Sequence, residues 1–100
     1  MFKIALLQYP ILWADKQANL DATSERIATL AGKADVALLP EMFTTGFCTD
    51  HPELAEGMDG PTIRTLQHLA DTHHIAIVGS FICRPNPQND RLVNRGFMVK

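Results

Sequence analysis

The chain has 100 residues, of which 46% are hydrophobic and 20% are charged. This composition is typical of one globular domain and supplies enough apolar material for a core. A formal net charge of −2, with scattered basic residues, gives no electrostatic footprint for nucleic acid or for an anionic membrane surface. No apolar run approaches the roughly 18 residues that a membrane span needs. We therefore expect neither nucleic acid nor a membrane as a partner.

The first half of the chain predicts a strand, a helix and a second strand. Residues 3–8 are apolar nearly throughout and form the first strand. Asp15 is a good N-cap for a helix that runs to about Ala31, and Gly32 supplies its left-handed cap. Residues 36–39 are four apolar residues in a row, which predicts a short strand buried on both faces. Two strands joined through a helix predict a right-handed crossover.

The second half begins with a long segment, residues 44–60, that lacks regular periodicity. Long irregular loops in compact domains are usually functional, although we expect the acidic second half of this one to be solvated surface. Pro61 then opens a second helix. Its predicted buried face comprises Ile63, Leu66, Leu69, Ala70 and His73. Residues 75–83 and 92–100 predict an antiparallel pair of strands.

This order of elements predicts an α/β layered domain. The last strand is still running at Lys100, and a sheet that ends there leaves an edge that natural domains normally cover. We therefore expect residues 1–100 to be the first part of a longer domain.

Glu41 is the residue that the pattern singles out. It follows Pro40 at the carboxyl end of the second strand, where open α/β sheets place their ligands. Its neighbours in the sequence are apolar, and a carboxylate that is costly to ionise is suited to act as a general base. The competing interpretation is a surface glutamate that begins a loop.

Other kinds of site find less support. His73 and His74 are adjacent, so on a helix they diverge by about 100°. His51 and His68 have no spaced partners, and the sequence predicts no metal site. Neither GxGxxG nor GxxxxGK occurs, so no phosphate-binding loop and no cofactor are expected.

Cys48 and Cys83 form no CxxC pair, and their spacing leaves a single disulfide as an alternative to free thiols. Free thiols in a reducing cytoplasm are the expected state. Cys48 could be imagined as a nucleophile paired with Glu41, but its acidic loop disfavours the thiolate. Cys83 precedes Arg84, a better electrostatic setting, yet buried cysteines are usually structural. We interpret both cysteines as structural.

Four segments together resemble the nitrilase superfamily of carbon–nitrogen hydrolases, namely residues 3–8, 38–47, 75–80 and 93–95. The sequence Glu-Met-Phe-Thr-Thr-Gly-Phe within the second segment is most similar to the omega-amidase branch. That branch removes ammonia from the side-chain amide of 2-oxo dicarboxylate monoamides such as 2-oxoglutaramate. The resemblance implies the N-terminal part of a four-layer αββα sandwich, which forms homodimers or higher homo-oligomers and takes a small-molecule amide as substrate.

The resemblance also implies a mechanism in which a glutamate activates a cysteine thiol and a lysine stabilises the oxyanion. Only the glutamate has a counterpart here, Glu41. The lysine and the cysteine are expected beyond Lys100, so the segment alone is expected to be inactive. Phe43 and Phe47 match aromatic positions near the substrate pocket, and Asn94 is expected to fix the backbone near Glu41. The alternative is a non-catalytic α/β binding or interaction module of the same fold.

Overall fold

The computed structural model describes residues 1–48 and 50–100. In these residues the strands and helices follow the predicted order. They are β1 (Ile4–Leu6), α1 (Lys16–Leu30), β2 (Val36–Leu38), the 3-10 helix η1 (Pro52–Leu54), α2 (Pro61–His73), β3 (Ala76–Cys83) and β4 (Val93–Val99). The short helix η1 lies within the long segment that the sequence analysis treated as irregular.

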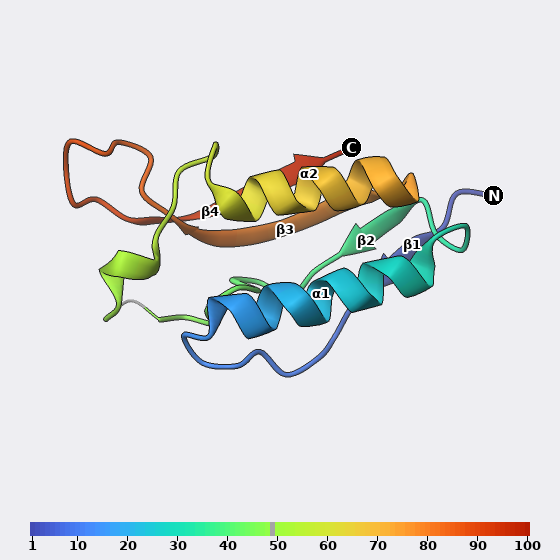
Figure 1. The fold of residues 1–100 in the computed structure, drawn as a ribbon, viewed down its shortest axis with the longest axis horizontal. Coiled ribbons are helices and arrows are strands. Elements are labelled where there is room, and N and C mark those ends of the chain that lie inside the picture. Colours follow the sequence, from blue (N-terminus) through green and yellow to red (C-terminus); the bar gives the residue numbers. More distant parts are fainter. Residues whose placement is uncertain (49) are drawn as a thin grey trace.

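The four strands form one mixed sheet in the order β1-β2-β3-β4 (Figure 1). β1 and β3 each pair with β2 in parallel, and β4 returns antiparallel to β3. The parallel pairing that a crossover through α1 requires is therefore confirmed, as is the antiparallel pair at the end of the chain. Because β1, β2 and β3 run the same way, the turn that follows β2 emerges at the carboxyl edge of the sheet.

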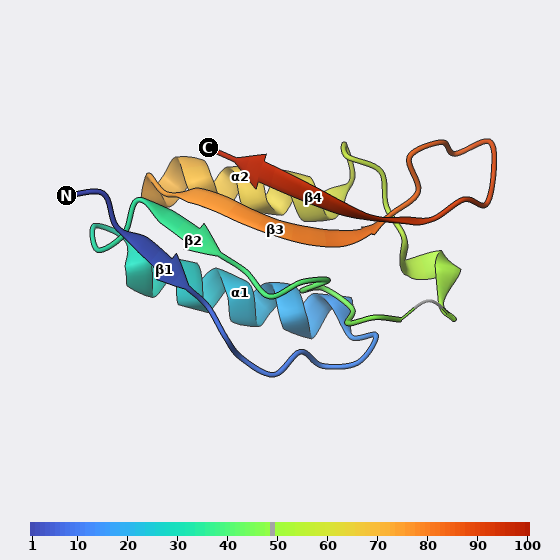
Figure 2. The ribbon, with the colours of Figure 1, turned by 180° about the vertical axis from the view of Figure 1, so that it is seen from behind.

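Both helices cover the same face of the sheet, and Figure 2 shows the strands in front of them from the other side. The core lies between these two layers. Its most deeply buried apolar side chains include Ile27 of α1, Leu66 of α2, and Ile77 and Phe81 of β3, each at most 1% exposed. Packing against the sheet, more than helix propensity, is what stabilises helices of this length.

Local signals predicted the helix ends better than the buried helix faces. The Asp15 side chain caps α1 by accepting a backbone hydrogen bond, Gly32 has a positive φ of +76°, and Pro61 is the first residue of α2. The first helix was expected to run to about Ala31; it ends at Leu30, and Ala31 is exposed just past it. His73, at the end of α2, is only half-buried. Across the described ranges, the helices fall short of the length and hydropathy that crossing a membrane requires.

The other face of the sheet carries apolar side chains that no described helix covers. One row crosses all four strands through Leu6, Leu38, Val78 and Met98, which are neighbours in the pairing register. Leu6 and Met98 are 68% and 57% exposed. β1 spans three residues instead of the predicted six at 3–8, and it is an edge strand that pairs only with β2. We refer to this side as the open face, and the candidate site lies on it.

Candidate active site

Glu41 lies just beyond the end of β2. The amide of Leu39 still donates to the carbonyl oxygen of Val78 on β3 at 2.8 Å, and Pro40 follows. The expected place at the carboxyl end of the strand is therefore confirmed. The expected apolar burial of the carboxylate is wrong, because Glu41 is exposed while Met42 and the three residues after it are buried. The turn directs the apolar residues inward and leaves the carboxylate in water, so that no free energy is spent on removing its charge from water.

The turn after Glu41 has an unusual backbone conformation. Met42 has a φ of +53°, a left-handed conformation that is uncommon for a residue with a side chain, and Gly46 closes the turn with a φ of +74°. The Met42 carbonyl oxygen accepts hydrogen bonds from the amides of Thr45 at 3.2 Å and Gly46 at 2.8 Å. Strained residues of this kind cluster at functional sites. Here the strain falls on the residue next to the candidate base.

The carboxylate of Glu41 has a hydrogen-bond partner on β4. The Asn94 side-chain amide, Nδ2, donates to Glu41 Oε2 at 3.3 Å, across 53 positions of sequence. Asn94 was expected to fix the backbone near Glu41. The structure corrects this expectation, since Asn94 contacts the side chain of Glu41 instead.

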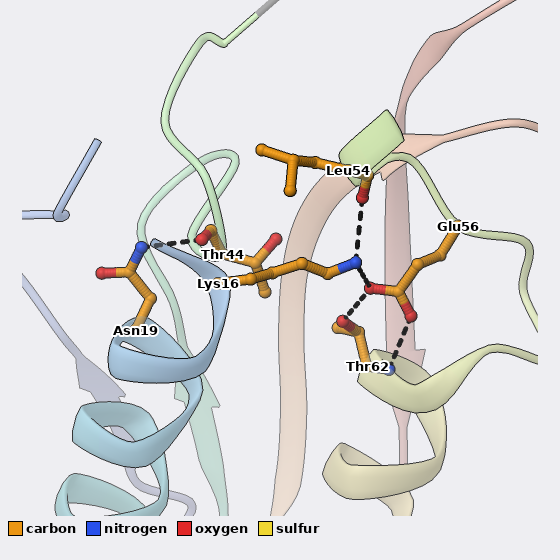
Figure 3. A network of polar contacts seen from close by, with 6 residues as sticks. All are labelled: Lys16, Asn19, Thr44, Leu54, Glu56 and Thr62. Atoms are coloured by element: carbon orange, nitrogen blue, oxygen red, sulfur yellow. Dashed lines mark hydrogen bonds and ion pairs between the residues drawn. The ribbon is translucent and has the colours of Figure 1, made fainter. Parts of the chain in front are cut away.

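Asn19, a residue that the sequence analysis did not single out, anchors the same turn from the helix side. Its side chain is buried, and Nδ2 donates to the carbonyl oxygen of Thr44 at 2.7 Å (Figure 3). Nδ2 also donates to the carbonyl oxygen of Leu12 at 2.8 Å. Its Oδ1 accepts from the Leu12 amide at 2.9 Å. The available signal was an asparagine next to Leu20 in a predicted helix. A polar side chain on the buried face of a helix needs hydrogen-bond partners.

A cavity of about 380 Å³ is lined by Met42, the residue that follows Glu41, and by Asn94, the hydrogen-bond partner of Glu41. Its lining includes Met42 and Phe47 from the turn, Asp90 and Leu92 from the loop before β4, and Asn94. Asn94 thus lines the cavity and also contacts Glu41. The arrangement combines a carboxylate, a neutral amide donor and an apolar surface at one edge of the sheet.

The two aromatic residues expected near the substrate have different surroundings. Phe47 is 59% exposed and lines the cavity. Phe43 is fully buried in the core, and its ring centroid lies 6.0 Å from that of Phe97. The structure therefore places Phe43 beneath the turn that carries Glu41, as packing, and substrate contact by Phe47 stays a prediction.

Glu56 shows that the acidic loop is not simply solvated surface, as the sequence analysis had expected. Its side chain is only 7% exposed and forms an ion pair with Lys16 Nζ at 2.5 Å. The amide and hydroxyl of Thr62 donate to its two oxygens at 2.8 and 2.5 Å, and Lys16 also donates to the Leu54 carbonyl oxygen (Figure 3). We call Lys16, Glu56 and Thr62 the helix clamp, because they join the first turns of α1 and α2.

The helix clamp keeps the carboxylate of Glu56 ionised. Burial by itself raises the pKa of this group, but hydrogen bonds from Lys16 and Thr62 and the charge of Lys16 outweigh it, and the pKa lies below its ordinary value. Every contact of Glu56 stabilises the charged form. Such a carboxylate is suited to hold two helices together and poorly suited to accept a proton.

Both cysteines are buried and free, as expected. Burial raises the pKa of the Cys48 thiol, and the charge of Asp50, to which Sγ donates at 3.7 Å, raises it further. Burial also raises the pKa of Cys83, against the opposing charge of Arg95. Neither thiol is activated as a nucleophile, because the thiolate is the reactive form.

His51 does have neighbours in space, contrary to the sequence analysis. Ligand atoms of Cys48, Asp50 and His51 lie within 4.8 Å of one another. His51 Nδ1 is also 2.9 Å from Glu53 Oε1, which raises the pKa of the imidazole. These contacts join residues within one loop and already satisfy one another, so we assign them no metal.

The chain is similar in sequence to known carbon–nitrogen hydrolases. The family model described as Carbon-nitrogen hydrolase matches residues 3–100. The Omega-amidase YafV of Yersinia enterocolitica is 36% identical over 98 residues, which cover 98% of this chain and 36% of that protein. The (R)-stereoselective amidase of a Pseudomonas species is 33% identical over 81 residues, which cover 79% of this chain and 30% of that protein. The chain therefore spans about a third of the length of these relatives.

Solved structures show the same fold. XC1258 of Xanthomonas campestris, a CN-hydrolase superfamily protein with an arsenic adduct in its active site, matches with a TM-score of 0.88 and 34% identity, over 98% of this chain and 36% of that one. Nit3 of Saccharomyces cerevisiae, a member of branch 10 of the nitrilase superfamily, matches with a TM-score of 0.81 and 25% identity, over 98% and 39%. The predicted nitrilase-like α/β fold is confirmed.

Proposed function

This chain belongs to the carbon–nitrogen hydrolase family, and from this premise we propose that it supplies Glu41 as the general base of an amidase. The substrate is a small-molecule amide, and the reaction is that of an omega-amidase acting on a 2-oxo dicarboxylate monoamide such as 2-oxoglutaramate. The similarity to the Omega-amidase YafV of Yersinia enterocolitica supports the choice of substrate. Residues 1–100 are then the first part of a longer catalytic domain.

One observation supports the role of Glu41 above the others. Its carboxylate stands at the carboxyl end of a parallel strand and contacts Asn94, which lines the cavity. Glu56, in contrast, is enclosed by donors that hold it ionised. Of these two glutamates, Glu41 is the one whose carboxylate is not enclosed by hydrogen-bond donors among the described residues.

In the proposed reaction, Glu41 accepts the proton of a cysteine thiol and the thiolate attacks the amide carbonyl carbon. The tetrahedral intermediate collapses as the C–N bond breaks, and the proton held by Glu41 leaves with ammonia. Water then adds to the thioester with Glu41 again as base, which releases the carboxylic acid and restores the thiol. A lysine stabilises the oxyanion in both halves. As the family resemblance implies, the proposal takes the lysine and the nucleophilic cysteine from beyond Lys100. Cys48 and Cys83 are both buried with raised pKa values, which makes them unsuitable as the nucleophile.

The test is ammonia release from 2-oxoglutaramate by the complete protein and by residues 1–100 alone. We expect turnover only by the complete protein. We expect Glu41→Gln to lower its turnover by at least about 10²–10⁴-fold, because a positioned base contributes that much. The melting temperature should stay unchanged, because Glu41 is exposed.

Glu25→Gln is the matched control, since Glu25 is an exposed glutamate on α1 and should leave turnover intact. An active Glu41→Gln variant would refute the role of Glu41. Turnover by residues 1–100 alone would refute the proposal that the catalytic lysine and cysteine come from beyond Lys100.

A further inference from the structure

We propose that Ser80 and Asn94 are positioning residues for Glu41, with Ser80 holding the backbone of the turn and Asn94 orienting the carboxylate. This inference rests on the proposed function of Glu41. It assigns to β3 and β4 a role in aiming a base that is carried by neither strand.

The pairing register places both side chains on the open face. Ser80 pairs with Gly96, and Ile82 pairs with Asn94. Directly paired residues share a face, and so do residues two apart on one strand, so Ser80 and Asn94 project from the same side of the hairpin. The residue opposite Ser80 is Gly96, which has no side chain to cover the Ser80 hydroxyl.

Ser80 stabilises the strained residue that follows Glu41. Its Oγ accepts a hydrogen bond from the Met42 amide at 2.9 Å, and its carbonyl oxygen accepts one from the Phe43 amide at 3.3 Å. Met42 has the left-handed conformation, with a φ of +53°. Such a conformation persists only where its surroundings determine it. The backbone conformation of Met42 in turn affects the direction in which the side chain of Glu41 projects. By binding the Met42 amide, the hydroxyl of Ser80 therefore fixes the backbone from which the Glu41 side chain extends.

Asn94 fixes the other end of that side chain. Its Nδ2 donates to Oε2 at 3.3 Å, and among the described residues no other hydrogen bond reaches this carboxylate. The second oxygen, Oε1, accepts no hydrogen bond from the described residues. A lysine or arginine in place of Asn94 would stabilise the ionised carboxylate strongly and weaken it as a base, whereas a neutral amide orients it with a smaller effect.

The experiment uses the complete protein and the pH dependence of kcat/KM for amide hydrolysis. Asn94→Asp places a second carboxylate beside Glu41, so the acid limb of the profile should move to higher pH, because like charges disfavour the ionised base. Asn94→Ala should move the limb less and lower kcat about tenfold with little change in KM. Asn86→Asp adds the same charge in the hairpin loop, away from Glu41, and should leave the limb in place.

Ser80→Ala should lower kcat with little change in KM, and Ser80→Thr should restore most of the activity because it keeps the hydroxyl. A purely structural role would change the melting temperature of these variants without moving the acid limb or separating kcat from KM. Parental pH profiles and kcat values in the Asn94 and Ser80 variants would overturn the inference. Parental behaviour of the Asn94 and Ser80 variants, together with an inactive Glu41→Gln variant, would refute only the positioning roles. An active Glu41→Gln variant would refute the proposed function.

Discussion

Glu41 and Glu56 lie in the same connection between β2 and α2, yet their surroundings are opposite. Glu56 is buried against the helices, and Lys16 and Thr62 satisfy both of its oxygens. Glu41 is exposed on the open face, and among the described residues its carboxylate has a single long hydrogen bond, to Asn94. Hydrogen bonds and the charge of Lys16 hold the pKa of Glu56 below its ordinary value. Glu41, the proposed base, is accessible to solvent and has no such enclosure among the described residues.

The comparison extends to the two sides of the sheet. Residues on the helix-covered side make the contacts that determine stability, whereas residues on the open face line the cavity and carry the candidate base. Substitutions on the first side should therefore change the free energy of unfolding, and substitutions on the second should change turnover.

The largest effect on stability is expected at Phe43, and Phe47 in the same turn serves as its comparison. Phe43→Ala should lower the free energy of unfolding by about 3–5 kcal/mol, because it removes a fully buried ring that packs on Phe97. Phe47→Ala should change it by less than about 0.5 kcal/mol, because Phe47 is largely exposed. Urea unfolding of the two variants measures both values. Equal losses would show that the turn is not divided into a packed side and an open side.

The helix clamp should give a smaller but clear effect. Glu56→Ala leaves Lys16 and the Thr62 amide without their shared partner, and we expect it to cost about 2 kcal/mol. Glu53→Ala, at an exposed acid of the same loop, is the control and should leave the urea midpoint nearly unchanged. If the two variants unfold at the same urea concentration, the buried ion pair does not contribute to stability.

The smallest effect is the pH dependence that the clamp confers. The pKa of Glu56 is lowered below its ordinary value of 4.5, so its contribution to stability is fully present above pH 4.5 and is lost as the pH falls through the folded-state pKa. The stability difference between the parent and Glu56→Gln should therefore shrink as the pH is lowered from about 6 to about 3. A difference that stays constant over this range would contradict the lowered pKa.

The order of the strands and helices could be predicted from the sequence because their signals are local. Asp15 and Pro61 mark helix starts within one residue, and Pro40 marks the end of the ladder that places Glu41 at the edge of the sheet. The family resemblance was carried by the same short segments. The exposure of Glu41 could not be predicted, because the direction of a turn depends on what packs beneath it.

The anchors of the site depend on contacts between distant parts of the chain. Asn19 reaches Thr44 across 25 positions, Ser80 reaches Met42 across 38, and Asn94 reaches Glu41 across 53. A single sequence shows which side chains can donate or accept, but not which of them meet. For that reason Asn19 was missed, and Asn94 was assigned to the backbone instead of the carboxylate.

Asn19 has a consequence for how the protein can vary. One amide on α1 binds the connection before the helix, at Leu12, and the turn after β2, at Thr44. Any rotation or sliding of α1 on the sheet is thereby transmitted to both segments at once. Changes in the packing of this helix are thereby expected to alter the orientation of the Glu41 carboxylate. Under the proposed function, substitutions that alter turnover need not lie at the cavity.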